Sequence, residues 1–269
     1  MNSTCTHPTT YSSDITNDEW DIIAPYLDGD PKIGSPRTVC IRCVVNALFY
    51  LHRTGCQWNM LPSDLPNYGT VHYYFRTWTK NGILVRLNRD LCQRLRVQEG
   101  RSPDPSLAIV DSQTVKTTEI GGDVGFDGNK KIKGRKRHIF TDILGLLLSI
   151  TVTHAAIQDA NSAPLIGPSI HAAFPTITKV LADQGYKHAF CAWFANHCQW
   201  IVEIVIKPPP DPDQPGFHVV PKRWIVERTF AWFGRYRRLS KDYEYHTSHS
   251  ESMILLASIH RMLKRIVLK

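Results

Sequence analysis

The sequence predicts an α/β fold in which a mixed five-stranded sheet, flanked by helices, follows a small all-helical domain. Up to residue 96 the hydrophobic residues recur at helical spacing, and the next ten residues contain Gly100, Pro103 and Pro105. Beyond them, short apolar runs of strand length alternate with helical patterns, which favours a sheet covered by helices. The predicted order is a loosely ordered tail at 1–13, a helical domain at 14–96, a linker at 97–106 and a sheet domain at 107–269.

The helical domain is predicted to begin with a capping box. Thr16 and Glu19 have the three-residue spacing that lets each side chain cap the backbone of the other, so a helix should run from about 17 to 27. A longer helix is expected at 37–54, where apolar residues again recur at helical spacing.

A further helix at about 70–80 has the composition of a recognition helix. It ends at Asn81 and Gly82 and presents short polar, aromatic and basic side chains, the mixture that a helix-turn-helix element offers to a DNA major groove. An ordinary surface helix is the alternative. The candidate DNA-binding residues on this helix are His72, Tyr73, Arg76 and Lys80.

Five strands are predicted in the second domain, with helices between and after them. The strands are expected at 107–110, 136–142, 145–153, 179–182 and 201–206. The helices are expected at about 159–172, 187–199, 222–240 and 250–267.

The charge balance favours a polyanionic partner, and it is uneven along the chain. Lys and Arg number 32 against 24 Asp and Glu, which gives a net charge of +8. Residues 130–138, KKIKGRKRH, hold six Lys or Arg, and a second basic cluster follows residue 234. The candidate DNA-binding residues in these clusters are Lys131, Lys133, Arg135, Lys136, Arg137, His138, Arg235, Arg238 and Lys241.

The cysteine pattern favours a reducing compartment. Seven cysteines form no regular framework, and we expect a cytoplasmic, nucleoid-associated protein without a membrane partner. Cys40 and Cys43 have the spacing of a zinc half-site, as do residues near His188 and Cys191. Neither group has a second pair at ligand spacing, so zinc is the weaker interpretation.

Two predicted strands end in an aspartate, Asp111 and Asp183, followed by small or polar residues. A carboxylate at the end of a buried strand costs free energy unless a cation or hydrogen bonds compensate it, and α/β folds place ligand sites at such ends. Metal binding would explain both residues. The alternative is that each caps a following turn.

A third candidate carboxylate, Glu227, lies in the segment WIVERTFAWFGRYRRL. A helix through this segment would align Arg223, Glu227, Gly234 and Arg238 on one stripe and leave the aromatic side chains to pack against the sheet. The alternative is a simple ion pair between Arg223 and Glu227 on a solvated face.

Three carboxylates gathered around two divalent ions would suit phosphodiester cleavage and strand transfer. Mg²⁺ is the expected cofactor, as two ions with Mn²⁺ able to substitute, because it prefers hard oxygen ligands from few carboxylates.

The chain resembles the DDE-class transposases of insertion-sequence families four and five. The matching stretches are VDSQTVKT around Asp111, GRKRHIFTDILGLLLS from Gly134, LADQGY around Asp183 and WIVERTFAWFGRYRRLSKDYE around Glu227. EWDIIAPYL and GCQWNMLP resemble the helical domain that precedes the core in that family, so the resemblance covers nearly the whole chain.

The resemblance implies an RNase H-like core in which Asp111, Asp183 and Glu227 are catalytic and hold the metal ions, and in which Arg223 belongs to the signature around the glutamate. The family signature has a tyrosine upstream of the arginine and a lysine seven residues after the glutamate. Here those places hold Val220 and Gly234. Arg235, Arg238 or Lys241 would have to bind phosphate in place of that lysine.

The function expected from the resemblance is transposition. The protein would bind the terminal inverted repeats of an insertion sequence as a homodimer or larger oligomer on double-stranded DNA, cleave the strand ends and join them to target DNA. Two alternatives stay open: a catalytically inactive DNA-binding regulator derived from a transposase, and an RNase H-like nuclease.

Overall fold

The computed structural model describes residues 11–27, 38–119, 121–206 and 222–268. The predicted tail at 1–13 lies outside these ranges as far as residue 10, and so does Val220. The last residues of that tail are held in place: the Tyr11 hydroxyl donates to Asp64 at 2.9 Å, and Ser13 is buried.

The N-terminal part is helical, as predicted. The helices are α1 (Asn17–Leu27), α2 (Ile41–Thr54), α3 (Tyr68–Lys80) and α4 (Ile83–Gln98), with a 3-10 turn η1 at Trp58–Met60. The capping box is confirmed, because the Thr16 amide donates to Glu19 Oε2 at 2.9 Å and the Glu19 amide donates to Thr16 Oγ1 at 3.2 Å.

A six-stranded mixed sheet forms the second part, one strand more than predicted. The strands are β1 (Leu107–Lys116), β2 (Gly125–Asp127), β3 (Ile132–Thr141), β4 (Leu147–His154), β5 (Lys179–Ala182) and β6 (Ile201–Ile204). The strand missed from the sequence is β2, which has only three residues and pairs with the first residues of β3.

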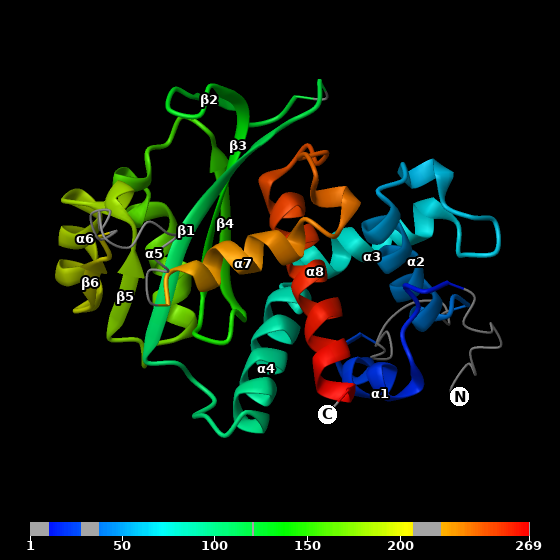
Figure 1. Ribbon diagram of the computed structural model, residues 1–269. Coiled ribbons are helices and arrows are strands. Elements are labelled where there is room, and N and C mark those ends of the chain that lie inside the picture. The colour runs from blue at the N-terminus through cyan, green and yellow to red at the C-terminus, as the bar shows by residue number, and fades with distance from the viewer. Residues whose placement is uncertain (1–10, 28–37, 120, 207–221, 269) are drawn as a thin grey trace, which may run out of the picture.

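The strand order identifies the fold as RNase H-like. β1 lies between antiparallel β3 and parallel β5, β4 pairs with the far edge of β3, and β6 pairs in parallel with β5. The order is therefore β4-β3-β1-β5-β6, and β2 pairs with the first residues of β3, on the same edge of β3 as β4. The long hairpin strands and the shorter parallel strands appear in Figure 1.

Helices cover both faces of this sheet. α5 (Ala163–Ala173) and α6 (Ala189–Cys198) pack on the face to which Ala108 and Val110 point. α7 (Trp224–Phe233), with α4 and α8 (Thr247–Val267), covers the face that carries Ile109 and Leu181. Three further 3-10 turns are η2 (Asp159–Asn161), η3 (Gln184–Tyr186) and η4 (Arg237–Leu239).

The C-terminal helix α8 belongs to the helical part as much as to the sheet. In Figure 1 it runs beside α4 toward α1, and its residues share one hydrophobic core with all four N-terminal helices. Lys264 Nζ donates to Glu19 Oε2 at 3.0 Å, and Thr79 Oγ1 donates to Ser252 Oγ at 2.9 Å. The chain therefore returns from the sheet to complete the helical part.

Several element boundaries differ from the sequence prediction; β3, for example, begins at Ile132 instead of 136. Two of the differences bear on the site. β1 continues past Asp111 to Lys116 because it pairs with β3 along its whole length, so Asp111 lies within the strand. α7 ends at Phe233 instead of near residue 240, because Tyr236 has an extended backbone. The predicted helical stripe through Gly234 and Arg238 therefore does not form.

In the described ranges, no helix is both long enough and apolar enough to cross a lipid bilayer.

Candidate catalytic site

The sheet brings Asp111 and Asp183 to the same level on neighbouring strands. Ile109 of β1 is the register partner of Leu181 of β5, and each aspartate follows its strand's partner residue by two positions. Side chains two residues apart point to the same face, so both carboxylates lie on the face that α7 covers. The two aspartates that the sequence singled out are therefore neighbours.

Local hydrogen bonds fix these two side chains. The Ser112 amide donates to Asp111 Oδ1 at 2.7 Å, and the Gly185 amide donates to Asp183 Oδ1 at 2.8 Å. The Asp111 side chain is 17% exposed, which leaves it open on one side.

Glu227 comes to the same face from α7. Ile225 and Val226 anchor this helix in the core, and the Thr229 hydroxyl donates to the Gly145 carbonyl at 3.1 Å. Glu227 itself stays 47% exposed and forms an ion pair with Arg223 one turn earlier. Arg223 Nη1 also lies 4.0 Å from Asp111 Oδ2, so this guanidinium connects Glu227 with Asp111.

The pKa of Asp111 depends on its burial and on the charged groups around it. The pKa of Asp111 is raised to about 7, chiefly by burial and also by the negative charges of Asp183 and Glu227, while the Ser112 amide and Arg223 oppose the increase. A nearby cation would stabilise the ionised form of such a carboxyl group, because it offsets both the cost of desolvation and the repulsion by the neighbouring carboxylates.

The donor set fits a hard divalent cation by its chemistry, since all three side chains offer carboxylate oxygens and Asp111 and Asp183 are adjacent. Within the described part of the chain, however, no three His, Cys, Asp or Glu residues stand close enough together to hold a metal ion. One oxygen of the Glu227 carboxylate is held in the ion pair with Arg223. Neither cysteine-containing group of the sequence analysis forms a zinc site among the described residues.

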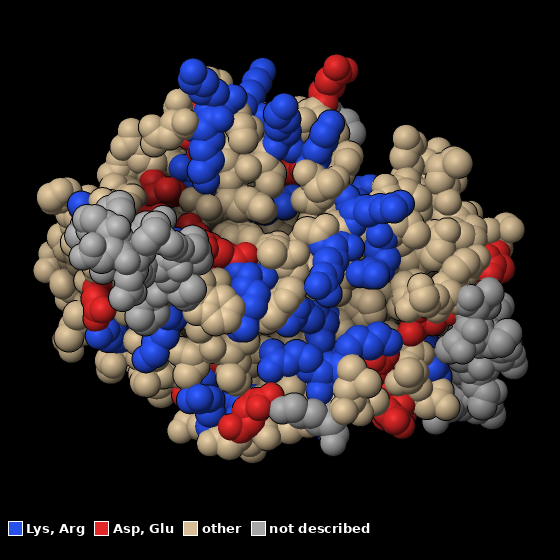
Figure 2. Space-filling view, viewed as in Figure 1, with Lys and Arg blue, Asp and Glu red and all other residues tan. Residues whose placement is uncertain are grey.

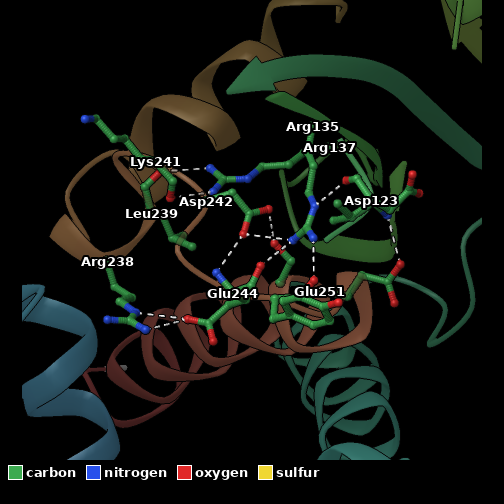
Figure 3. Close-up of polar contacts among 12 residues, drawn as sticks. Asp123, Arg135, Arg137, Arg238, Leu239, Lys241, Asp242, Glu244 and Glu251 are labelled. Carbon is green, nitrogen blue, oxygen red and sulfur yellow. Dashed lines mark hydrogen bonds and ion pairs between the residues drawn. The ribbon is translucent and has the colours of Figure 1, made fainter. Parts of the chain in front are cut away.

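Five of the predicted DNA-binding side chains are buried. Arg135 is 0% exposed, and its guanidinium donates to Glu244 O and Tyr245 O at 2.6 Å each and to Asp242 Oδ1 at 3.3 Å. Arg137 donates to the Leu239 carbonyl at 2.8 Å. Figure 3 shows both arginines pointing from β3 into the segment that follows α7, which they hold against the sheet.

The other three buried residues also make internal contacts. Arg238 donates to Glu244 Oε1 at 2.7 Å, Lys136 donates to the Ile157 carbonyl at 2.8 Å, and His138 lies 3.2 Å from Thr153 Oγ1. For Arg135, Lys136, Arg137, His138 and Arg238, a structural role therefore replaces the predicted DNA contact, because their charged or polar ends face the protein interior.

The remaining basic candidates lie at the surface. Figure 2 shows Lys and Arg gathered in a band from the β2–β3 end of the sheet across the middle of the molecule to the helical part, with acidic side chains beside it. His72 is half-buried against Trp58, at 4.8 Å between ring centroids, and Arg223 is 22% exposed. The exposed candidates are Lys131, Lys133, Arg235, Lys241, Tyr73, Arg76 and Lys80.

Two family models match the chain. Residues 15–88 match the model for transposases of the IS4/5 family, and residues 102–262, more than half of the chain, match the transposase DDE domain. The chain belongs to the DDE transposases. This transposase is therefore an enzyme of the nucleotidyl-transferase type, from a family that uses divalent metal ions.

Comparisons with individual proteins add little to the family assignment. No curated protein matches the transposase. Among solved structures, the Mos1 mariner paired end complex with Mn is 13% identical with a TM-score of 0.30, and covers 88% of this chain and 80% of that one. A pre-cleavage Mos1 transpososome is 10% identical with the same TM-score and coverage. At these values the fold assignment depends on the strand order.

The sequence analysis missed Asp159, which lies near both aspartates of this transposase. Ser112 Oγ donates to Asp159 Oδ1 at 2.8 Å, and Ser112 directly follows Asp111. The available signal was weak, because an aspartate shortly before a helix, here α5 at Ala163, is typical of an ordinary turn or cap.

Proposed function

We propose that this transposase binds the terminal inverted repeats of an insertion sequence and catalyses metal-dependent strand cleavage and strand transfer. Asp111, Asp183 and Glu227 are the proposed catalytic and metal-binding residues. The observation that carries the proposal is the register of β1 and β5, which sets two aspartates side by side beneath the helix that carries Glu227.

Mg²⁺ is the proposed cofactor, as two ions for which Mn²⁺ can substitute. When bound, such ions lower the pKa of an attacking water or 3′-hydroxyl and stabilise the leaving oxygen. The side chains of Asp111 and Asp183 would hold these ions from the sheet, with Glu227 reaching in from α7. Glu227 must exchange its contact with Arg223 to do so, because one carboxylate oxygen already accepts from that guanidinium.

Arg223 would then be free to contact DNA. A guanidinium binds phosphate oxygens through parallel hydrogen bonds, and Arg223 stands between Asp111 and Glu227 with 22% of its side chain exposed. The exposed basic band would hold the flanking duplex, with α3 as the candidate recognition helix. Pairing two ends of an element requires at least two subunits, so we propose a dimer or larger oligomer on DNA.

Cleavage of a duplex that carries the terminal repeat tests this proposal. The repeat is read from the inverted sequences that should bracket the coding region. Wild-type protein should cleave the strand end in Mg²⁺ or Mn²⁺, and D111N, D183N and E227Q should each lose cleavage while retaining DNA binding. The matched control is E203Q, which changes an acidic residue paired with Lys179 at the sheet edge and should cleave normally. Full cleavage by any of the three site variants would contradict the assignment.

Product analysis separates transposition from the two alternatives. A pre-cleaved end with a free 3′-hydroxyl should be joined to target DNA by a transposase, whereas a nuclease gives only shortened strands. A regulator without catalysis would bind the repeat and show no Mg²⁺ binding by calorimetry.

A further inference from the structure

A buried chain of polar contacts runs beneath the catalytic aspartates, on the opposite face of the sheet. Ser112 and Thr114 alternate with Asp111 along β1 and bury their hydroxyls on the side covered by α5 and α6. Ser112 Oγ donates to Asp159 Oδ1 at 2.8 Å, and Thr114 Oγ1 donates to Asp127 Oδ2 at 2.6 Å. Each hydroxyl of the strand thus has its own carboxylate.

One lysine joins these two carboxylates. Lys136 Nζ lies 3.3 Å from Asp159 Oδ1 and 3.7 Å from Asp127 Oδ2, and it donates to the Ile157 carbonyl at 2.8 Å. The lysine is 5% exposed, so its charge is compensated inside the protein. The contacts form a continuous chain from Ser112 through Asp159, Lys136 and Asp127 to Thr114.

The Asp159 end of this chain reaches both catalytic aspartates. Ser112 makes two contacts at once: its hydroxyl donates to Asp159, and its amide donates to Asp111 Oδ1 at 2.7 Å. A methyl group added to Gly185 would lie 3.0 Å from Asp183 Oδ1 and 3.6 Å from Asp159 Oδ2, so these two carboxylates flank the same backbone. Asp159 therefore lies between the segment of Asp111 and the segment of Asp183.

Asp159 keeps access to water. It lines a cavity of about 330 Å³ together with Lys136, Asp127 and Gly185. The Asp159 carboxylate therefore contacts Ser112 and Lys136 while its side chain, 26% exposed, still reaches this cavity.

We propose that Asp159 is a positioning residue for the catalytic centre. Held by Lys136, its carboxylate orients Ser112, whose amide sets the Asp111 carboxylate, and supports the Gly185 backbone, whose amide sets Asp183. This inference rests on the proposed function, because it assigns Asp159 a role only if the two aspartates bind metal. Asp127 and Thr114 make the same kind of contact two residues further from Asp111 and serve as the internal control.

The test measures Mn²⁺ binding to the full chain, with the free ion detected by electron paramagnetic resonance. The dependence of cleavage on Mn²⁺ concentration is the second readout. D159N should weaken Mn²⁺ binding by roughly 10- to 100-fold, as loss of an outer-shell partner of a metal ligand does. DNA affinity and the urea midpoint are measured on the same samples. DNA affinity should stay unchanged.

A double-mutant cycle tests whether Asp159 acts on Asp111 through Ser112. S112A should weaken Mn²⁺ binding as well, and the S112A/D159N double variant should be no worse than D159N, because both changes break one connection. S112A removes a single oxygen, so it keeps the test usable if D159N does not fold. The control variants T114V and D127N should lower the urea midpoint and leave Mn²⁺ binding unchanged.

The proposal is overturned if D159N and S112A bind Mn²⁺ like the wild type, if their effects simply add, or if T114V and D127N weaken binding equally. A wild-type protein that neither binds Mn²⁺ nor cleaves would instead contradict the proposed function. The two failures are therefore distinguishable.

Discussion

At Asp111, a guanidinium and two carboxylates act in opposite directions on the same group. Burial, Asp183 and Glu227 raise the pKa of Asp111, while Arg223 and the Ser112 amide lower it. Arg223 also engages Glu227, so in the free protein it supplies the positive charge that a metal ion would supply in the proposed active complex. In the proposed complex, metal and guanidinium would therefore compete for the same carboxylates.

Replacement of Arg223 by glutamine should tighten Mn²⁺ binding to the free protein, because Glu227 is released from its ion pair. A partly exposed pair is worth up to about 1 kcal/mol, which corresponds to a gain of roughly two- to fivefold. R228Q is the control on the same helix, since Arg228 packs over the Trp224 and Trp232 rings. Unchanged or weaker binding in R223Q, measured by titration with Mn²⁺, would contradict this competition.

Arg135 should act on stability and not on DNA affinity. R135M leaves Asp242 buried without this charged partner, and breaking a buried pair in this way costs about 3–5 kcal/mol of unfolding free energy. K133M, two residues earlier on the same strand, removes an exposed charge. It should weaken DNA binding and leave the unfolding free energy unchanged. Urea unfolding and DNA titration of both variants check the assignment, which fails if R135M weakens DNA binding at wild-type stability.

At the scale of elements, the sequence predicts where a helix starts better than where it ends. It predicts secondary structure better than the burial of individual side chains. The Thr16 and Glu19 pair places the start of α1 because both partners lie within one turn. The burial of Arg135 and Arg137 could not be predicted, because their partners follow α7, about a hundred residues later in the chain. In isolation, KKIKGRKRH is indistinguishable from a solvated basic strand.

The candidate catalytic site likewise has residues that a local pattern predicts and residues that it does not. Asp111 and Asp183 follow apolar strands, and a local pattern is enough to select them. The Arg223 contact to Asp111 and the position of Asp159 depend on register and on helix placement, which no local pattern contains. The end of α7 was missed because aromatic and basic residues continue past Phe233 although the backbone turns away.

The packing of α2 against α8 should make stability depend on pH. Burial lowers the pKa of His52 on α2 to about 4 and that of His260 on α8 to about 3, from an ordinary value of 6.5. Below pH 6.5 the unfolded chain therefore binds more protons at these two histidines than the folded protein does. Their contribution to the free energy of unfolding decreases as the pH falls from 6.5 toward 4.

Buried carboxyl groups with raised pKa values, such as Asp111 and Glu251, act in the opposite direction. The comparison of wild type with H260F isolates the histidine effect. His260 already stacks on Phe49 at 4.3 Å, so a phenylalanine should be accommodated. Urea unfolding from pH 7 to 5 should show a smaller loss of stability in H260F than in the wild type. An equal loss in both would show that His260 is not the group responsible.

At the scale of the whole molecule, one hydrophobic core joins the helical part to the α7 face of the sheet. Helices α4 and α8 make this connection, because they pack against each other and both contact β4. These partners lie far apart in the chain, so no local sequence pattern predicts the contacts. The exposed basic band of Figure 2 extends over both parts, so in the proposed complex one continuous duplex would contact both.

The salt dependence of DNA binding should identify members of this band. Each phosphate contact contributes about −0.9 to the slope of log affinity against log salt. K131A and K133A together should make the slope shallower by up to about 1.8 if both lysines contact phosphate. K179A, on β5 and paired with Glu203 of the neighbouring strand β6, is the control and should leave the slope unchanged.

The most direct test is a crystal structure of the transposase with its terminal duplex and Mn²⁺, in which anomalous scattering locates the ions. We expect anomalous peaks in contact with Asp111, Asp183 and Glu227, with Arg223 turned from Glu227 to a phosphate. Peaks that lie elsewhere, or a Glu227 still bound to Arg223 beside a correctly placed DNA end, would contradict this expectation.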